Sequence, residues 1–211
     1  MTMAMYSDSA ARNRILKKSR SDGDYDGLWR ARSIYLAEIF IFAGMIQYIA
    51  NEAHYKEVLS RAAKVKRSLW IGTADIKDLY VEDRPFLGIL ADLIKKGREV
   101  RLIHAKEPGP NFREDFDQYP VLFTGLERAL CPRVHFKILV FDCEVAYVGS
   151  ANLTGAGIGR KGTRTRNFEA GVLTDEPALV EAAMEQFDSV WAGFKCKDCG
   201  RRMFCGDPIL K

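Results

Sequence analysis

The sequence predicts an α/β domain with a mixed β-sheet flanked by helices, and two observations predict this class. From residue 52 onward, segments with the apolar spacing of an α-helix alternate with short runs of β-branched and other apolar residues. Strands that alternate with helices are typical of layered α/β domains. Two of the runs, residues 134–141 and 145–149, are separated by only three residues, so we expect them to pair as an antiparallel hairpin within the sheet.

The individual elements follow from the same spacing. Helices are expected where apolar residues recur every three or four positions, at residues 54–66, 85–96 and 177–191. Strands are expected at residues 68–74, 99–104, 134–141, 145–149 and 168–174. Gly97 is expected to end the second helix, because glycine adopts the left-handed conformation that terminates helices. Residues 108–120 contain three prolines among polar residues, so we expect a loop there.

Length and composition set the domain organisation. The chain has 211 residues, of which 47% are apolar, and this is enough for one domain with a core of its own. We expect that domain to span residues 34–194, after a polar arm, residues 1–33, with a basic cluster at residues 12–20. Residues 195–211 form a tail with three of the five cysteines. Cysteines that are odd in number and crowded in this way do not form a secreted disulfide framework, so a cytoplasmic location is expected.

The most apolar segment, IYLAEIFIFAGMIQYIA, covers residues 34–50. It is shorter than the ~20 residues that a membrane-spanning helix needs, and Glu38 and Gln47 would be costly to bury in lipid. We therefore expect a buried strand or helix beside the core, with a strand at residues 38–42. Contact with a membrane is the less favoured alternative.

The strand HFKILVFD, residues 135–142, carries a histidine and a lysine on one face. Side chains alternate between the two faces of a strand, so His135 and Lys137 point the same way. If the hairpin turns at residues 142–144, the antiparallel register places them opposite the segment GSAN, residues 149–152. Ser150 and Asn152 then join them, and Gly149 is expected to let the backbone approach a ligand closely. An imidazole, a cation, a hydroxyl and an amide can together address the oxygens of a phosphate.

Two acidic residues complete this group. Glu169, in the segment RNFEAGV, is a candidate to fix the tautomer of His135 from a neighbouring strand. Asp142 is expected to accept hydrogen bonds from amides of the hairpin turn rather than to take part in the chemistry. Each of these residues taken alone has an ordinary structural interpretation, as a strand histidine, an edge lysine, a turn or a surface acid. Their combination at fixed spacing favours a functional site.

The pattern H-x-K-x4-D, followed after six residues by G-S-x-N, resembles the signature of the phospholipase D superfamily. The resemblance extends from about residue 34 to residue 194 and implies a phospholipase D-like fold. It also implies phosphodiester chemistry without a catalytic metal. His135 would attack phosphorus to form a phosphohistidine, while Lys137 and Asn152 hold the nonbridging oxygens. Ser150 would orient the phosphate, Glu169 would fix the histidine tautomer, and a second histidine would protonate the leaving group.

This chain carries the motif once. His54 and His104 are its other histidines, and neither is followed by the rest of the motif. Large members of the family carry the motif twice, whereas the small single-motif members form homodimers in which each subunit gives one histidine to a shared site. The resemblance therefore implies a homodimer.

The loop that follows the motif, residues 154–167, is rich in glycine and positive charge. It carries Arg160, Lys161, Arg164 and Arg166. These charges suit the backbone of DNA or RNA, although a solvated loop is an equal alternative. We expect a nuclease. Two alternatives stay open: an enzyme that hydrolyses or transfers phospholipid headgroups, favoured by the apolar segment at residues 34–50, and a non-catalytic module that binds nucleic acid.

The tail KCKDCGRRMFCGDP contains Cys196, Cys199 and Cys205 in the arrangement C-x2-C-G and C-G, which is typical of zinc knuckles. The three thiolates leave one position of a tetrahedral site open, and Asp207, another cysteine or a dimer partner could fill it. Structural zinc is one prediction, and free reduced thiols are the alternative. Cys131 and Cys143 are expected to be small buried residues.

Overall fold

The computed structural model describes residues 44–77, 79–158, 162 and 164–208. The predicted arm, residues 1–33, and the predicted strand at residues 38–42 lie outside the described residues. Among the described residues no helix has both the length and the apolar character needed to cross a bilayer.

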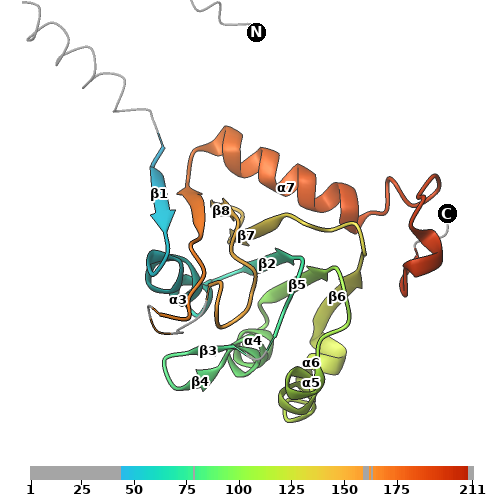
Figure 1. The fold of residues 1–211 in the computed structure, drawn as a ribbon, viewed down its shortest axis with the longest axis horizontal. Helices are drawn as coiled ribbons and strands as arrows, with labels where there is room; N and C mark the ends of the chain where they lie inside the picture. The colour runs from blue at the N-terminus through green and yellow to red at the C-terminus, as the bar shows by residue number, and fades with distance from the viewer. Residues whose placement is uncertain (1–43, 78, 159–161, 163, 209–211) are drawn as a thin grey trace, which may run out of the picture. The chain divides into compact units, whose positions relative to one another are not determined.

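The domain is built on one seven-stranded mixed sheet (Figure 1). Its strands are β1 (Ile46–Ala50), β2 (Ser68–Thr73), β5 (Glu99–His104), β6 (Leu126–Leu130), β7 (Lys137–Phe141), β8 (Val145–Gly149) and β9 (Ala170–Thr174). They lie in the order β1-β9-β8-β7-β2-β5-β6. β2, β5 and β6 run parallel, and the remaining pairs are antiparallel. β3 (Tyr80–Val81) and β4 (Arg84–Pro85) form a separate ribbon. The predicted mixed α/β class is confirmed.

Helices cover both faces of the sheet. They are η1 (His54–Leu59), a π-helical turn that continues into α3 (Ser60–Ala62), then α4 (Phe86–Lys95), α5 (Pro110–Asp117), α6 (Val121–Gly125) and α7 (Pro177–Trp191). A 3-10 turn, η2 (Arg202–Phe204), lies in the tail. α7 lies on one side of the sheet and α4 to α6 lie on the other (Figure 1).

Alternate side chains of β2 supply both halves of the core. Leu69 and Ile71 are fully buried in the half that contains α4, whereas Trp70 belongs to the half that contains α7. On that side Phe187 of α7 is fully buried and stacks on Trp70 with ring centroids 5.3 Å apart. Truncation of a buried aromatic ring of this kind lowers the free energy of unfolding by about 3–5 kcal/mol. The stacking therefore stabilises the packing of α7 on the sheet.

Several predicted boundaries match the structure. α4 ends before Gly97, whose φ of 72° places it in the left-handed region, as predicted. The strand at residues 99–104 and the helix at residues 177–191 are confirmed with those bounds. The first helix is shorter than expected, because η1 and α3 together end at Ala62.

The prediction of a loop at residues 108–120 is wrong. α5 occupies most of this segment, and α6 and β6, which were not predicted, follow it. Pro110 lies at the first position of α5, where the missing N–H would have no partner in any case. Phe112 is buried, and its ring lies 6.2 Å from that of Phe116.

Two further expectations need correction. Within residues 34–50, the described part forms β1, an edge strand on which Ile49 is buried but Ile46 and Tyr48 are 62% and 71% exposed, so the segment is not a wholly buried element. Cys143 is exposed rather than buried, because it stands in the turn between β7 and β8, and Cys131 is half-buried. Asp142 and Cys143 have φ of 57° and 58°, the left-handed pair that a tight hairpin turn requires.

Candidate active site

The predicted site residues meet at one edge of the sheet, where neighbouring strands begin or end. Lys137 opens β7 and lies opposite Gly149, the last residue of β8, which in turn lies opposite Gly171 of β9. The register predicted for the hairpin is therefore confirmed. His135 precedes β7 by two residues, so the strand begins later than the predicted residue 134. The other predicted residues flank the same strands: Ser150, Asn152 and Glu169.

Lys137 is a buried cation beside an exposed imidazole. Its side chain is only 5% exposed, whereas His135 is exposed to solvent. The Lys137 Nζ atom donates a hydrogen bond to the carbonyl oxygen of His135 at 2.7 Å and lies 3.4 Å from the Nδ1 atom of the ring. Burial lowers the pKa of Lys137, and the nearby carboxylate of Glu169 opposes that shift. An anion that binds here meets a cation that little water screens.

Asn152 is fixed by the loop that follows β2. Its Oδ1 atom accepts hydrogen bonds from the backbone N–H of Asp75 at 3.1 Å and from the Thr73 hydroxyl at 3.3 Å. The Thr73 Oγ1 atom also accepts a hydrogen bond from the N–H of Leu153 at 3.2 Å. Because these contacts occupy the amide oxygen of Asn152, its NH₂ group is the part that can donate to a phosphate oxygen.

Glu169 is bonded to Ser150 rather than to His135. The Ser150 hydroxyl donates to one carboxylate oxygen of Glu169, and Asn167 Nδ2 donates to the other at 3.1 Å. The Ser150 Oγ atom in turn accepts from the N–H of Ala170 at 3.0 Å. Among the described contacts of Glu169 there is no hydrogen bond to His135, so its role in fixing the imidazole tautomer stays a prediction.

Three positioning residues were missed by the sequence analysis: Thr73, Asp75 and Asn51. Asn51 holds the segment that leads into β9, because its N–H donates to the Glu169 carbonyl at 3.0 Å and its Oδ1 atom accepts from the Glu169 N–H at 3.2 Å. Its φ of 47° is in the left-handed region, which asparagine tolerates better than most residues. These residues lie far from the motif in sequence, so only the order of strands in the sheet could have indicated them.

Gly149, the first residue of the GSAN segment, makes room for a tyrosine, whereas the expected close approach of the backbone to a ligand stays a prediction. A Cβ atom on Gly149 would overlap the Tyr147 hydroxyl and would lie 2.8 Å from the Ala170 carbonyl oxygen. A Cβ atom on Gly171 would lie 2.5 Å from the ring of Tyr147. Tyr147 is fully buried, its ring meets His54 edge to face, and burial raises its pKa. The ring of Tyr147 thus packs against the backbone of Gly149 and Gly171, next to the candidate site.

His135 is the exposed one of the three histidines in the chain. His54 and His104 are fully buried, and burial lowers the pKa of both. Their Nδ1 atoms lie within hydrogen-bonding distance of the backbone carbonyls of Asn51 and Lys106. A fully buried imidazole cannot reach a substrate in solvent, so one chain offers the candidate site a single accessible histidine.

Asp142 stabilises the far end of the hairpin. It accepts hydrogen bonds from the N–H groups of Lys66, Arg67 and Ser68 at 2.9, 2.6 and 3.1 Å. Burial would raise its pKa, but these N–H groups outweigh burial and lower it. The structural role was predicted, whereas the predicted partners in the turn itself were wrong. Asp142 instead ties the turn to the start of β2.

The basic loop is described only in part. Arg160 and Lys161 lie outside the described residues. Arg164 is exposed, and Arg166 is half-buried with its Nη1 atom 3.5 Å from the Gly157 carbonyl oxygen. Phe168, two residues further on, is 96% exposed beside Glu169.

The cysteines of the tail are not arranged as a formed metal site. Cys205 Sγ lies 3.6 Å from the Leu130 carbonyl oxygen, and Cys199 Sγ lies 3.8 Å from Arg133 Nη1. Within the part of the chain that the structure describes, no three His, Cys, Asp or Glu side chains are grouped so as to hold a metal ion. The zinc prediction for Cys196, Cys199 and Cys205 therefore stays a prediction.

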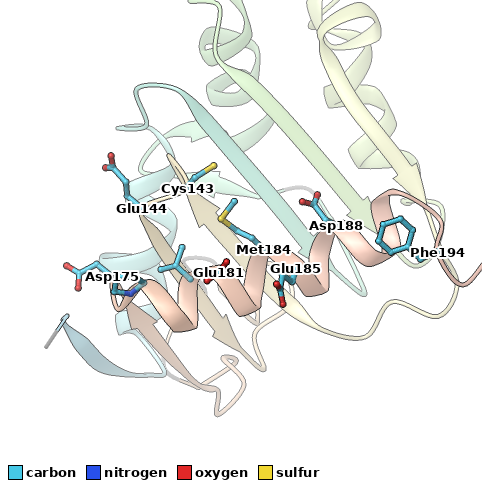
Figure 2. A pocket seen from close by; sticks show the side chains of 10 residues that line it. Cys143, Glu144, Asp175, Glu181, Met184, Glu185, Asp188 and Phe194 are labelled. Carbon is cyan, nitrogen blue, oxygen red and sulfur yellow. The ribbon is translucent and has the colours of Figure 1, made fainter. Parts of the chain in front are cut away.

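A cavity of about 780 Å³ lies away from these residues, between α7 and the β7–β8 turn. Figure 2 shows that carboxylates from α7 and the turn surround it, and its apolar lining includes Val180, Met184 and Phe194. The turn is at the opposite end of the hairpin from Lys137 and Gly149. The carboxylates that line the cavity would repel a phosphate, so this cavity is not part of the candidate active site.

Comparisons with known proteins agree with this arrangement. Residues 55–191 match the family model described as cardiolipin synthase, PLD-like domain. The structure of Nuc from Salmonella typhimurium, a phospholipase D family member, is similar with a TM-score of 0.53 and 20% identity over 71% of this chain and 95% of that chain. NucT from Helicobacter pylori is similar with a TM-score of 0.53 and 13% identity over 69% of this chain and 94% of that chain. A search of curated proteins found no match.

Proposed function

The chain belongs to the phospholipase D superfamily, and on that basis we propose that it is a phosphodiesterase that hydrolyses DNA or RNA at a site shared between two subunits. One observation carries the proposal: an exposed imidazole, a buried ammonium and an oriented amide lie together at the edge of the sheet, on His135, Lys137 and Asn152. This group contains a nucleophile and two donors for the oxygens of a phosphate.

The reaction proceeds in two displacements. An imidazole nitrogen of His135 attacks phosphorus, a P–N bond forms, and the P–O bond to the leaving group breaks. Lys137 and Asn152 donate hydrogen bonds to the nonbridging oxygens, where negative charge develops. A general acid protonates the leaving oxygen, and the same group then removes a proton from the water that cleaves the P–N bond and restores the imidazole.

The tautomer of His135 requires an acceptor. Attack by Nε2 needs the proton on Nδ1, but in the single chain Nδ1 faces the ammonium of Lys137, which is a donor. The carboxylate of Glu169 is the acceptor that we propose for the reactive state. It would have to exchange one of its contacts with Ser150 or Asn167 for the imidazole.

The general acid comes from a second subunit in this proposal. His54 and His104 are buried, so neither supplies an exposed imidazole to the site. A two-fold axis that passes beside His135 would bring the same residue of both subunits to one phosphate. One His135 then serves as nucleophile, and His135 of the partner subunit serves as acid and base.

The choice of nucleic acid rests on the surface beside the site. Arg164 and the remaining basic residues of the loop can neutralise phosphates along a strand, and Phe168 presents an exposed aromatic ring on which a base could stack. The alternative of a phospholipid substrate depended on the apolar segment at residues 34–50. The last five residues of that segment form β1 and pair with β9, which weakens that alternative.

The test compares four substrates. Purified full-length protein and the His135→Ala variant are incubated in EDTA with plasmid DNA, single-stranded DNA, RNA and a vesicle that contains phosphatidyl lipid. We expect the wild-type protein to cleave a nucleic acid in EDTA and the variant to be inactive. Because His135 is exposed, the variant should have the same melting temperature as the wild-type protein.

Other outcomes have separate meanings. Release of a lipid headgroup without nucleic-acid cleavage would assign the chain to the phospholipid branch. Binding of nucleic acid without turnover would make it a binding module. A strict requirement for added Mg²⁺ would contradict the histidine mechanism.

A further inference from the structure

The C-terminal tail shows an unusual pattern of exposure. Of residues 195–208, every one is exposed except Cys196, Cys199 and Cys205, which are half-buried. Even Met203 and Phe204 are 85% and 64% exposed. A segment with no buried apolar side chain gains little from the hydrophobic effect, and short segments of this kind usually depend on a disulfide or a metal.

Two of the three half-buried cysteines contact one short segment of the sheet domain. Cys205 Sγ lies 3.6 Å from the carbonyl oxygen of Leu130, and Cys199 Sγ lies 3.8 Å from Arg133 Nη1. Between these two contact points stands Cys131, itself half-buried and free. A fourth thiol therefore belongs to the short segment that Cys199 and Cys205 contact.

We propose that Cys131, Cys196, Cys199 and Cys205 bind one zinc ion as four thiolates. The spacing C-x2-C is typical of zinc ligands, and a tetrahedral set of four cysteines is a common structural zinc site. Gly200 and Gly206 follow two of these cysteines, and glycine lets backbone N–H groups approach thiolate sulfur closely. The proposal is independent of the catalytic function.

Cys131 suits the fourth position better than Asp207 does. The Asp207 Oδ2 atom accepts a hydrogen bond from the N–H of Leu130 at 3.4 Å, so this carboxylate already has a partner that fixes the tail to β6. Zinc with four thiolates carries a net charge of −2, and the guanidinium of Arg133 beside Cys199 is placed to balance it.

Metal binding must draw the sulfur atoms together. No three of the described His, Cys, Asp or Glu side chains are grouped closely enough to hold a metal ion, and zinc–sulfur bonds are about 2.3 Å long. Residues 195–208 bury no apolar side chain, so we expect the tail thiols to turn toward Cys131 when zinc binds. Binding is therefore expected to order the tail, as in other small zinc sites.

Cys131 would connect the proposed zinc site to the segment that carries His135. Cys131 lies four residues before His135, and its N–H donates to the carbonyl of His104 at 2.9 Å. A zinc ion held by Cys131 and the tail would anchor the segment from which the exposed histidine projects.

Zinc content provides the first test. The wild-type chain, purified under reducing conditions and supplied with zinc before gel filtration, should retain one zinc ion per chain by elemental analysis. Cys131→Ser and Cys199→Ser should lose it. Cys143→Ser is the matched control, since Cys143 is exposed in the β7–β8 turn, and it should retain a full ion. Full retention by Cys131→Ser, or no zinc in the wild-type chain, would overturn the proposal.

A second measurement avoids the risk that a variant fails to fold. The wild-type protein is alkylated with and without zinc, and each cysteine is followed by mass spectrometry. Zinc should protect Cys131 and the three tail cysteines at least tenfold and leave Cys143 unprotected. Equal alkylation of Cys131 in both states would contradict the assignment, as would a disulfide between Cys196 and Cys199 in the freshly purified protein.

Discussion

The Nζ atom of Lys137 lies 2.7 Å from the carbonyl oxygen of His135, two residues earlier in the same chain. This hydrogen bond fixes the backbone just before β7 and uses one of the three donors of the ammonium. A second N–H group faces His135 Nδ1 at 3.4 Å and the third can serve a phosphate. Burial lowers the pKa of Lys137 because little water solvates its charge. An anionic substrate would provide part of the stabilisation that burial removes.

Replacement of Lys137 should lower the activity of the protein without lowering its stability. In Lys137→Met the apolar side chain keeps a similar length, so we expect turnover of a chromogenic phosphodiester to fall about 10²–10³-fold, the usual cost of losing a donor to a developing negative charge. The melting temperature should change little, because removal of a buried charge offsets the loss of the hydrogen bond to the His135 carbonyl. Lys64→Met, at an exposed position, is the control and should change neither quantity. A Lys137→Met protein with full activity would remove Lys137 from the site.

Asp142 should make the stability of the protein depend on pH. Its folded-state pKa lies below the ordinary value, so above about pH 4 both states are ionised and its hydrogen bonds contribute fully. As the pH falls through the ordinary value toward the folded value, the unfolded chain takes up a proton first and this contribution is lost. Asp142→Asn should therefore lower the free energy of unfolding by about 2 kcal/mol at pH 7 and by less at pH 3.5.

Urea unfolding at both pH values measures this difference. Glu181→Gln, on the exposed side of α7, is the control and should leave both free energies close to those of the wild-type protein. An equal loss of stability at the two pH values would show that the hydrogen bonds from Lys66, Arg67 and Ser68 do not depend on the negative charge of Asp142.

The sequence predicted the part of the site that one hairpin holds. His135, Lys137, Ser150 and Asn152 are close in the chain, and the period of a strand together with the length of the turn sets their register. Glu169 lies directly before β9, next to the predicted hairpin, and its role toward His135 stays a prediction. Its bonds to Ser150 and Asn167 were not predicted, because they depend on side-chain orientation that sequence spacing does not record.

The residues that the sequence did not predict are those whose role depends on strand order. Thr73 and Asp75 orient Asn152 only because β2 lies next to β7 in the sheet. In the fold, α5 was missed because Pro110 was interpreted as a helix breaker, although at the first helical position it has no such effect. Burial of Phe112 against distant parts of the core decides that segment, and local patterns do not contain this information.

The basic loop should determine affinity for nucleic acid without affecting the chemistry. We expect alanine at all four basic positions, Arg160, Lys161, Arg164 and Arg166, to weaken binding of single-stranded DNA. The slope of log affinity against log salt should fall by about 0.7 for each phosphate that the loop no longer neutralises. Turnover of a small chromogenic phosphodiester should change little, since such a substrate does not reach along the loop.

A charge-matched variant controls for the removal of four positive charges. Alanine at four exposed lysines elsewhere on the domain, Lys64, Lys66, Lys95 and Lys96, should change the salt slope much less. If the loop variant also failed to turn over the small substrate, the loop would have to be assigned to the catalytic site or to folding.

The last prediction follows from the number of exposed histidines. One chain presents His135 alone, because His54 and His104 are buried, yet the two displacements need a nucleophile and a separate acid. Wild-type and His135→Ala chains with different tags are expressed together, and the doubly tagged dimer is purified. It should be inactive on nucleic acid, although with a substrate that has a good leaving group it should form the phosphohistidine, because that step needs no acid. Activity at about half the wild-type level would mean that each subunit holds a complete site, and the acid would then have to be found within one chain. Failure to recover any doubly tagged species, with a monomer in sedimentation, would contradict the shared site itself.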